Sequence, residues 1–274
     1  MIINVSCVQM YPKTADVDNN LQKMEGFIKN IMAERPKTNL IVFPELATTG
    51  YEATKDEFQQ IAEVVPDGKS MKFFGGICKK YGIHIVYGYA ERDPAVKDVL
   101  YNSALLMDDT GNVVGSYRKV HPFDTEKLWC RPGCGYPLFE TKIGKMGLFI
   151  CWDTAFPEVA RSYALQGADL LVVPTNWEKP YADDWDLITK ARAFDNTLPL
   201  VSANRIGDDK TLGFFGHSRI IGPTGNVIVT LDDEVEGTIH AEIDLTLSRK
   251  KRIEYYTFFK DRRPDTYGEL LRKY

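Results

Sequence analysis

The chain has 274 residues, which is enough for one large α/β domain or two small ones. Hydrophobic residues make up 44% and charged residues 26% of it, as is usual for a globular protein with a sizeable core. A net charge of −4 provides no broad basic field, so we expect no nucleic acid partner. No apolar stretch approaches the roughly 20 residues that cross a bilayer, so we expect no membrane partner.

The first half of the chain alternates between strand and helix patterns. The opening segment MIINVSCVQM lacks the basic and long apolar regions of a signal peptide and predicts a first strand. Short apolar or β-branched runs predict strands, and apolar residues at helical spacing predict helices. The predicted strands are 2–9, 39–44, 83–90, 100–107 and 113–119, and the predicted helices are 16–33, 58–64 and 70–81. The sequence Asp108-Asp109-Thr110-Gly111-Asn112 predicts the turn of a hairpin.

The second half repeats this alternation. The predicted strands are 147–150, 169–173, 198–205, 214–221, 227–231 and 238–243, and the predicted helices are 156–165 and 183–196. Strands that alternate with helices, together with two hairpins, predict an α/β sandwich. No linker or change of composition divides the chain, so we predict a single domain over 1–274. Within it, 255–274 is expected to form a C-terminal tail that packs on the body or on a partner subunit.

The cysteines bear on the compartment and on metal binding. Cys7, Cys78, Cys130, Cys134 and Cys151 are odd in number and have no regular spacing, which predicts free thiols in a reducing cytoplasm. The pair Cys130 and Cys134 could supply half of a metal site, but no second Cys/His cluster accompanies it, so we expect no metal. The basic run 249–252 is interpreted as a solvated helix end and not as a targeting signal.

Three polar residues follow apolar strand patterns directly: Glu45, Lys119 and Cys151. Each has an ordinary alternative, since Glu45 could begin a solvated loop, Lys119 could be a hairpin charge, and Cys151 could be a small core residue. The carboxyl ends of strands are nevertheless where α/β sheets bind ligands. Together the three form a workable catalytic set, because a carboxylate can accept a thiol proton and an ammonium can stabilise the resulting anions.

The sequence around these residues resembles the nitrilase superfamily of carbon–nitrogen hydrolases. The resemblance rests on Pro44-Glu45, on Tyr117-Arg118-Lys119-x-His121-x-Phe123 and on Cys151-Trp152-Asp153-x-x-Phe156-Pro157-Glu158. Shorter matches extend over almost the whole chain, among them Val8-Gln9-Met10, Tyr101-Asn102-Ser103, Arg131-Pro132-Gly133, Gly167-Ala168-Asp169, Pro174-Thr175-Asn176-Trp177, Ala191-Arg192-Ala193 and Ala203-Asn204-Arg205. Glu126, seven positions after the lysine, stands where this family has a second active-site glutamate.

The resemblance implies a four-layer α-β-β-α sandwich that forms homodimers or higher homo-oligomers and uses neither a cofactor nor a metal. It also implies that Glu45, Lys119 and Cys151 are catalytic, with Lys119 and the backbone N–H of Trp152 holding the oxyanion. Glu126 is then expected to orient Lys119 or the substrate amine, or to form a structural ion pair. The substrate should contact Tyr51, Trp152, Asn176 and Trp177, although plain packing is an alternative for Tyr51 and Trp177.

The motif Cys151-Trp152-Asp153 resembles the one found in the branch of the family that acts on carbamoyl and linear amide groups. We therefore predict an amidase that cleaves a small linear or N-carbamoyl amide through a thioester. A nitrilase is the first alternative, and a non-catalytic binding member is the second; the presence of all three candidate catalytic residues argues against the second. His121 is predicted to have a packing role, and the acidic residues Asp183, Asp184 and Asp186 are expected to mark a helix N-terminus more than a site for a cationic amine.

Overall fold

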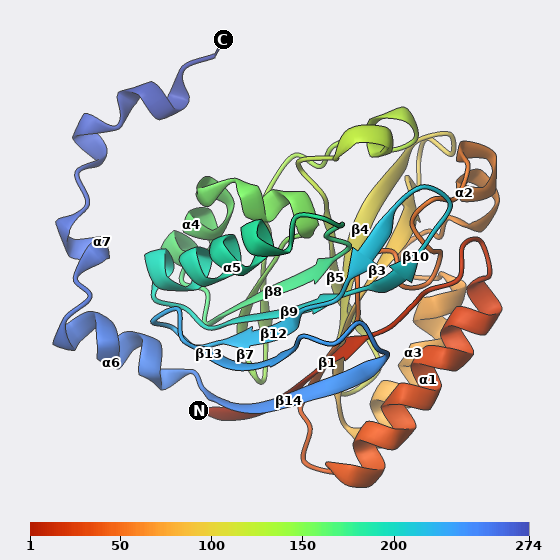
Figure 1. The fold of residues 1–274 in the computed structure, drawn as a ribbon, viewed down its shortest axis with the longest axis horizontal. Coiled ribbons are helices and arrows are strands. Elements are labelled where there is room, and N and C mark those ends of the chain that lie inside the picture. Colours follow the sequence, from red (N-terminus) through yellow and green to blue (C-terminus); the bar gives the residue numbers. More distant parts are fainter. Residues whose placement is uncertain (274) are drawn as a thin grey trace.

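The computed structural model describes residues 1–273. Two six-stranded sheets lie face to face (Figure 1). The first consists, in spatial order, of β14 (Gly237–Asp244), β1 (Ile2–Gln9), β2 (Leu40–Val42), β3 (His84–Arg92), β4 (Leu100–Met107) and β5 (Val113–Arg118). The second consists of β13 (Val227–Leu231), β12 (Ser218–Ile221), β9 (Leu200–Asn204), β8 (Leu170–Thr175), β7 (Gly144–Leu148) and β6 (Leu138–Thr141).

Helices cover the outer face of each sheet. Helices α1 (Val17–Glu34) and α3 (Lys69–Tyr81) lie on the first sheet, and α4 (Pro157–Gln166) and α5 (Ala182–Asn196) lie on the second (Figure 1). The predicted four-layer sandwich is therefore confirmed. Short elements complete the chain: α2 (Lys55–Ile61), the hairpin β10 (Ile206–Asp208) and β11 (Gly213–Phe215), α6 (Thr246–Glu254) and α7 (Phe258–Asp261).

The central strands of each sheet, such as β2, β8 and β9, are buried on both faces, which explains their continuous apolar runs in the sequence. Successive side chains of a strand point to opposite faces. Leu40 and Val42 accordingly belong to the core between the sheets, whereas Ile41 and Phe43 pack in the core beneath α1 and α3. A strand that is buried on both sides has no polar face, so its sequence shows no alternation.

Strand directions determine which loops meet. In the first sheet β2 runs parallel to β3, and β5 is antiparallel to β4, which is antiparallel to β3. The carboxyl ends of β2 and β5 therefore lie at the same edge. In the second sheet β7 and β8 are parallel, so their carboxyl ends also share an edge. Glu45, Lys119, Cys151 and Asn176 all follow these four strand ends.

Two sequence predictions need correction. A single strand was predicted over 214–221, but the structure has β11 and β12 with a break between them. Gly216 and His217 both have positive φ, +85° and +57°, so the chain turns there and cannot continue a strand. The predicted helix 58–64 begins earlier, at Lys55, because Thr54 forms an N-terminal capping box with Glu57.

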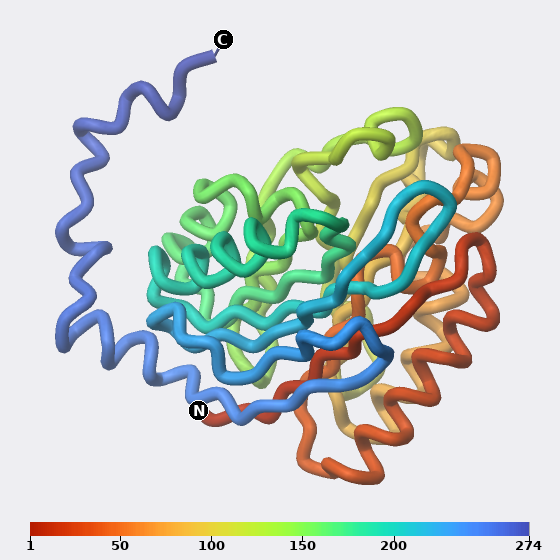
Figure 2. The backbone as a smooth tube through the Cα atoms, in the orientation of Figure 1, coloured from red at the N-terminus to blue at the C-terminus, as the bar shows by residue number. Residues whose placement is uncertain are grey.

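The C-terminal tail agrees only in part with its prediction. Tyr256 and Phe258 pack against Phe194 of α5, and Arg161 of α4 lies over the ring of Phe259. Residues 260–273 then leave the body (Figures 1 and 2). The last residue of the predicted tail, 274, lies outside the described residues. Over residues 1–273, no helix combines the length and apolar character required to span a membrane.

Candidate active site

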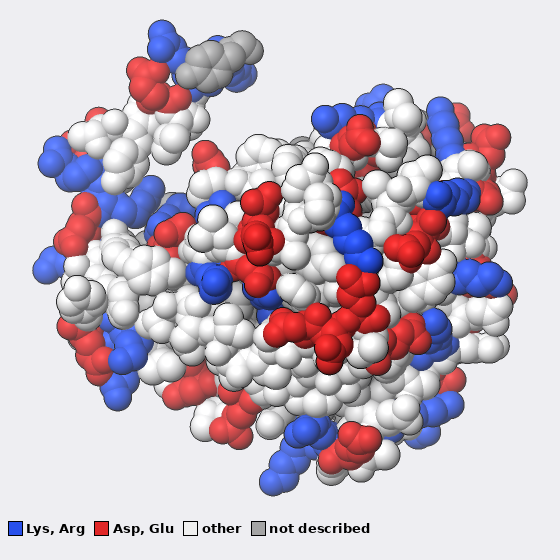
Figure 3. All heavy atoms as spheres, viewed as in Figure 1, with Lys and Arg blue, Asp and Glu red and all other residues white. Residues whose placement is uncertain are grey.

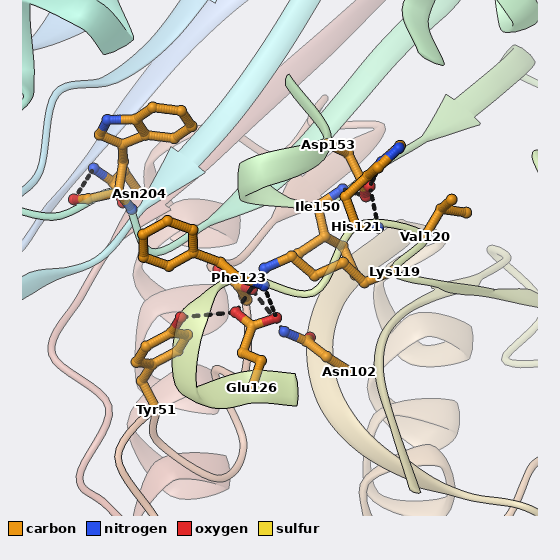
Figure 4. A network of polar contacts seen from close by, with 12 residues as sticks. Tyr51, Asn102, Lys119, Val120, His121, Phe123, Glu126, Ile150, Asp153 and Asn204 are labelled. Atoms are coloured by element: carbon orange, nitrogen blue, oxygen red, sulfur yellow. Dashed lines mark hydrogen bonds and ion pairs between the residues drawn. The ribbon is translucent and has the colours of Figure 1, made fainter. Parts of the chain in front are cut away.

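A buried ion cluster joins the ends of β2 and β5. The Nζ atom of Lys119 lies 2.8 Å from Oε1 of Glu45 and 2.6 Å from Oε1 of Glu126. Asn102 of β4 donates from Nδ2 to the same Oε1 of Glu45, at 2.7 Å (Figure 4). The other Glu45 oxygen, Oε2, has no hydrogen-bond partner within residues 1–273. Glu45 is thus held by one oxygen and leaves the other available for proton transfer.

Glu126 is fully engaged by the protein. Its Oε1 accepts from Lys119 and, at 2.7 Å, from the hydroxyl of Tyr51, while its Oε2 accepts the backbone N–H of Phe123 at 3.2 Å (Figure 4). A carboxylate with these contacts has little capacity left for a substrate. Of the roles considered for Glu126, the geometry favours positioning Lys119.

Burial and the neighbouring charges shift the pKa values of Glu45 and Lys119. Burial raises the pKa of the Glu45 carboxyl to about 7, although the Lys119 ammonium acts in the opposite direction. This agrees with the requirement that one group serve first as a base and then as an acid near neutral pH. Burial alone would lower the pKa of Lys119, but the carboxylates of Glu126 and Glu45 outweigh it and raise the pKa well above its usual value. Lys119 therefore stays charged.

Cys151 occupies a strained turn between β7 and α4. Its φ is +43°, in the left-handed region that side chains other than glycine rarely adopt. It begins the 3₁₀ helix Cys151–Ala155. Burial and the charge of Glu45 raise the pKa of the thiol well above its usual value, although Lys119 lowers it. The resting thiol therefore keeps its proton, in line with the prediction that a carboxylate has to accept it.

A single aspartate supports this turn. Oδ2 of Asp153 accepts the Ile150 N–H at 3.0 Å and the hydroxyl of Tyr117 at 2.7 Å. Its Oδ1 lies 3.0 Å from the backbone nitrogen and 2.8 Å from Nδ1 of His121 (Figure 4). The His121 ring also stacks on Phe156, with ring centroids 3.8 Å apart. His121 is occupied structurally, as the sequence predicted.

Cys151 opens into a cavity of about 310 Å³. Its aromatic walls come from three separate segments: the β5–β6 connection, the cysteine turn and the β8–α5 connection. The lining residues are Phe123, Cys151, Trp152, Asn176, Trp177, Glu178, Tyr181 and Asp184. The predicted substrate contacts Trp152, Asn176 and Trp177 therefore share one cavity with the predicted nucleophile.

Tyr51 does not line the cavity, although the sequence analysis predicted that it would contact the substrate. It is buried beside Phe214, its hydroxyl donates to Glu126, and it is not among the residues lining the cavity. The physical reason is the buried Glu126 carboxylate, which needs hydrogen-bond donors. Glu45 and Lys119 are likewise fully buried, so Cys151 is the member of the predicted catalytic set that faces the cavity.

Sequence reasoning missed several contributors to the site. Asn102 and Asn204 appeared in the sequence analysis only as parts of motifs that match the family, and no role was predicted for either. Asn204 accepts the Trp177 N–H at 2.9 Å and so fixes the β8–α5 connection against β9. Glu178 and Tyr181 were not identified at all. A signal was available, because both follow Trp177 closely on a loop after a buried strand.

Comparison with known proteins identifies the family. A family model described as carbon–nitrogen hydrolase matches residues 4–253. A probable nitrilase of Schizosaccharomyces pombe is 55% identical, with 99% of each chain covered. An N-carbamoylputrescine amidase of Solanum lycopersicum is 33% identical, over 98% of this chain and 95% of the relative. The crystal structure of a carbon–nitrogen hydrolase from Helicobacter pylori superposes with a TM-score of 0.90 at 28% identity, covering 99% of both chains.

Proposed function

Because the chain belongs to the carbon–nitrogen hydrolase family, we propose that it hydrolyses the C–N bond of a small linear or N-carbamoyl amide through a thioester on Cys151. One observation carries the proposal: the ion pair of Glu45 and Lys119 is buried near a cysteine that faces a small aromatic cavity. The charges of Glu45 and Lys119 both act on that thiol. Base, cation and nucleophile therefore form one electrostatic unit.

In the first step the free Oε2 of Glu45 takes the proton from Sγ of Cys151, and the thiolate attacks the amide carbon. The carbonyl oxygen then becomes an oxyanion. An ammonium has three N–H donors, and Lys119 uses two on Glu45 and Glu126, which leaves one for this oxyanion. The backbone N–H of Trp152, in the first turn after Cys151, supplies the second donor.

In the second step the protonated Glu45 gives its proton to the leaving nitrogen, the C–N bond breaks, and ammonia or an amine departs. A thioester remains on Cys151. Glu45, again a carboxylate, takes a proton from water, and the hydroxide adds to the thioester carbon. When the C–S bond breaks, Glu45 returns the proton to sulfur and the acid is released.

An amide is favoured over a nitrile by Asn176. This residue lines the cavity with only 4% of its surface exposed, and neither its Oδ1 nor its Nδ2 has a hydrogen-bond partner within residues 1–273. Buried polar atoms of this kind are costly unless a ligand pairs with them. A primary amide or a carbamoyl group presents both a donor and an acceptor, whereas a nitrile presents only an acceptor.

Nitrile hydrolysis is the second candidate, and the relative of 55% identity named a probable nitrilase favours it. The same thiol would then add to the nitrile carbon. Matched substrates separate the two candidates. Hexanamide and hexanenitrile are incubated separately with the enzyme and ammonia is measured: consumption of the amide alone supports an amidase, and consumption of the nitrile identifies a nitrilase.

The thioester is tested by mass spectrometry of enzyme quenched during turnover of a slow amide. One acyl mass should appear on the wild type and map to Cys151, and it should be absent from Cys151→Ala. Cys134→Ala is the matched control, since Cys134 is exposed and lies outside the cavity. This variant should acquire the same adduct. An adduct that disappears with Cys134 while turnover persists would overturn the mechanism.

We also propose that residues 1–274 form one domain that assembles as a homo-oligomer. Large apolar side chains are exposed on the outer helices and beside the tail: Leu165 is 51% exposed, Leu187 66% and Tyr255 78%. Such residues are typical of a protein–protein interface, and residues 260–273 extend beyond the body where a second copy would lie (Figure 2). Leu187→Lys should lower the molar mass measured by light scattering.

We place the reaction in the cytoplasm. All five cysteines are free, and Cys134 is exposed. A nucleophilic thiol and an exposed free cysteine persist in a reducing compartment, whereas an oxidising one would drive them towards disulfides. Fractionation of cells that express the tagged protein checks this expectation.

A further inference from the structure

We infer that the outer part of the cavity is a cation subsite, in which Glu178 and Asp184 receive a positively charged group at the far end of the substrate. The inference rests on the proposed function and adds the substrate class: amides that bear an ammonium or a similar cation on a short linker. It starts from the charges of the cavity lining. Glu178 and Asp184 are the charged residues of that lining, and no basic residue accompanies them.

These two carboxylates are unpaired. Within residues 1–273, neither forms an ion pair or accepts a side-chain hydrogen bond. Asp186, two residues further along α5, differs, because it pairs with Arg219 and His217. The predicted helix N-terminus is confirmed for Asp183 and Asp184. The helix dipole favours an acidic residue in the first turn, but it does not explain why Asp184 faces the cavity or why Glu178, before the helix, does so too.

Glu178 is held in place by its backbone. It forms an isolated antiparallel bridge with Phe214, and the Tyr181 N–H donates to its carbonyl oxygen at 3.2 Å. The side chain is half-buried. Burial, then the charges of Asp124 and Glu52, raise the pKa of its carboxyl. A carboxylate kept in a negative and partly dry environment without a cation is stabilised when a cationic ligand arrives.

Asn176 is the independent observation that points to a ligand in the same cavity. Its buried amide lacks partners on both its oxygen and its nitrogen. Asn176 and Glu178 are two residues apart, so at most about 7 Å of chain separates them. A ligand with an amide at one end and a cation at the other can therefore contact both, with the amide towards Cys151 and the cation towards the opening.

The walls between these polar ends suit a hydrocarbon linker. Trp152 and Trp177 pack with their ring centroids 5.6 Å apart, and Phe123 lies beside Trp152 at 4.8 Å. Aromatic faces bind methylene groups and also attract cations. A cavity of about 310 Å³ lies at the small end of ligand sites, which limits the linker to a short one. Figure 3 shows acidic side chains gathered in the middle of the face that presents α5 and β12, which should attract a cation from solution.

The test uses three amides of equal length that differ only at the far end: ω-aminopentanamide, hexanamide and adipamate, which end in an ammonium, a methyl group and a carboxylate. Ammonia release gives kcat/KM for each at low salt. We expect ω-aminopentanamide to exceed hexanamide at least tenfold and adipamate by more. In the double variant Glu178→Gln, Asp184→Asn this preference for the ammonium should fall to less than threefold. Equal values of kcat/KM for the three amides in the wild type would overturn the inference and leave the amidase proposal intact.

The matched control is Asp183→Asn. It removes one negative charge from the helical turn that carries Asp184; Asp183 is exposed like Asp184 but does not line the cavity. The preference for the ammonium should stay near the wild-type value in this variant. An equal loss in the control and the double variant would mean that the general surface potential selects the substrate, which would overturn a built subsite.

A binding measurement separates this inference from the proposed function. Cys151→Ala cannot form a thioester, so calorimetry with ω-aminopentanamide and hexanamide reports recognition alone. Tighter binding of the ammonium compound supports the subsite even if the wild type hydrolyses none of the amides, and that second result would overturn only the amidase proposal. Equal binding of the two compounds would overturn the subsite.

Discussion

Two groups of carboxylates surround the same cavity under very different conditions. The inner pair, Glu45 and Glu126, is 0% and 1% exposed and shares one buried lysine. The outer pair, Glu178 and Asp184, lies towards solvent and has no cation among residues 1–273. The chemical group is the same, so the difference in role must come from environment. In the proposed mechanism, depth and pairing suit Glu45 to proton transfer and Glu126 to holding Lys119, while exposure leaves the outer pair free to attract a ligand.

The inner pair also shows how a buried site keeps its charge constant. With Glu45 ionised, the cluster of two carboxylates and one ammonium has one net negative charge, and the thiol is neutral. In the proposed mechanism Glu45 takes the proton from Cys151, so the negative charge moves to sulfur and the total is unchanged. Creating a new charge in a low-dielectric interior costs several kcal/mol, and this transfer avoids that cost. The outer pair faces no such constraint.

The largest effect should follow removal of the shared cation. Lys119→Met leaves two buried carboxylates without a cation, which should lower the free energy of unfolding by about 3–5 kcal/mol. Urea denaturation measures this change. The loss should be smaller below pH 7, where Glu45, with a pKa of about 7, becomes neutral.

The control is a lysine in an exposed ion pair. Nζ of Lys142 lies 3.0 Å from Asp109, but the lysine side chain is 68% exposed. Lys142→Met should change the free energy of unfolding by less than about 1 kcal/mol. If the two variants lose equal stability, burial is not what distinguishes the inner cluster.

The next effect concerns the base itself. Glu45→Gln keeps an oxygen that can accept from Asn102 and Lys119, but it removes the proton acceptor. We expect kcat/KM to fall about a hundred- to ten-thousand-fold, the usual contribution of a general base. The midpoint of thermal unfolding should stay close to the wild-type value. A collapsed melting transition together with lost activity would instead assign Glu45 a structural role.

A smaller and graded effect is expected from pH. The base must be ionised in the free enzyme, and the pKa of Glu45 is about 7. The value of kcat/KM should therefore rise with pH, reach half its plateau near pH 7, and fall about tenfold for each unit below that. The measurement uses a neutral substrate such as hexanamide, because its binding does not depend on the charge of the outer carboxylates. A profile that stays flat from pH 5 to 8 would contradict Glu45 as the base.

The inner group was predictable from sequence and the outer group was not, for a physical reason. Glu45, Lys119 and Cys151 each follow an apolar run in the sequence. Strand direction brings Glu45 and Lys119 to one edge of the first sheet, and Cys151 follows a strand of the facing sheet. The depth of Tyr51 could not be predicted, because it depends on a buried partner, Glu126, from a distant segment. The break at 216–217 was also hidden, since nothing local requires His217 to adopt positive φ.

The role of the outer residues depends on loop conformation. Glu178 lies after the end of β8, and its backbone is held by the bridge to Phe214 of the β10–β11 hairpin. No periodic pattern encodes such a contact between loops. Asp184 was recognised as a helix N-terminal residue, which is correct, but the helix geometry alone does not specify which of the adjacent acidic residues faces the cavity.

The smallest effect tests the claim that the outer carboxylates contribute little to folding. Asp184→Asn removes a charge that has no partner within residues 1–273, so the free energy of unfolding should change by less than about 0.5 kcal/mol. Asp186→Asn is the comparison on the same helix, because it leaves the guanidinium of Arg219, only 2% exposed, without its carboxylate. That variant should lose about 2 kcal/mol. Equal losses in the two variants would show that Asp184 is a structural residue, because a side chain reserved for a ligand adds no stability until the ligand binds.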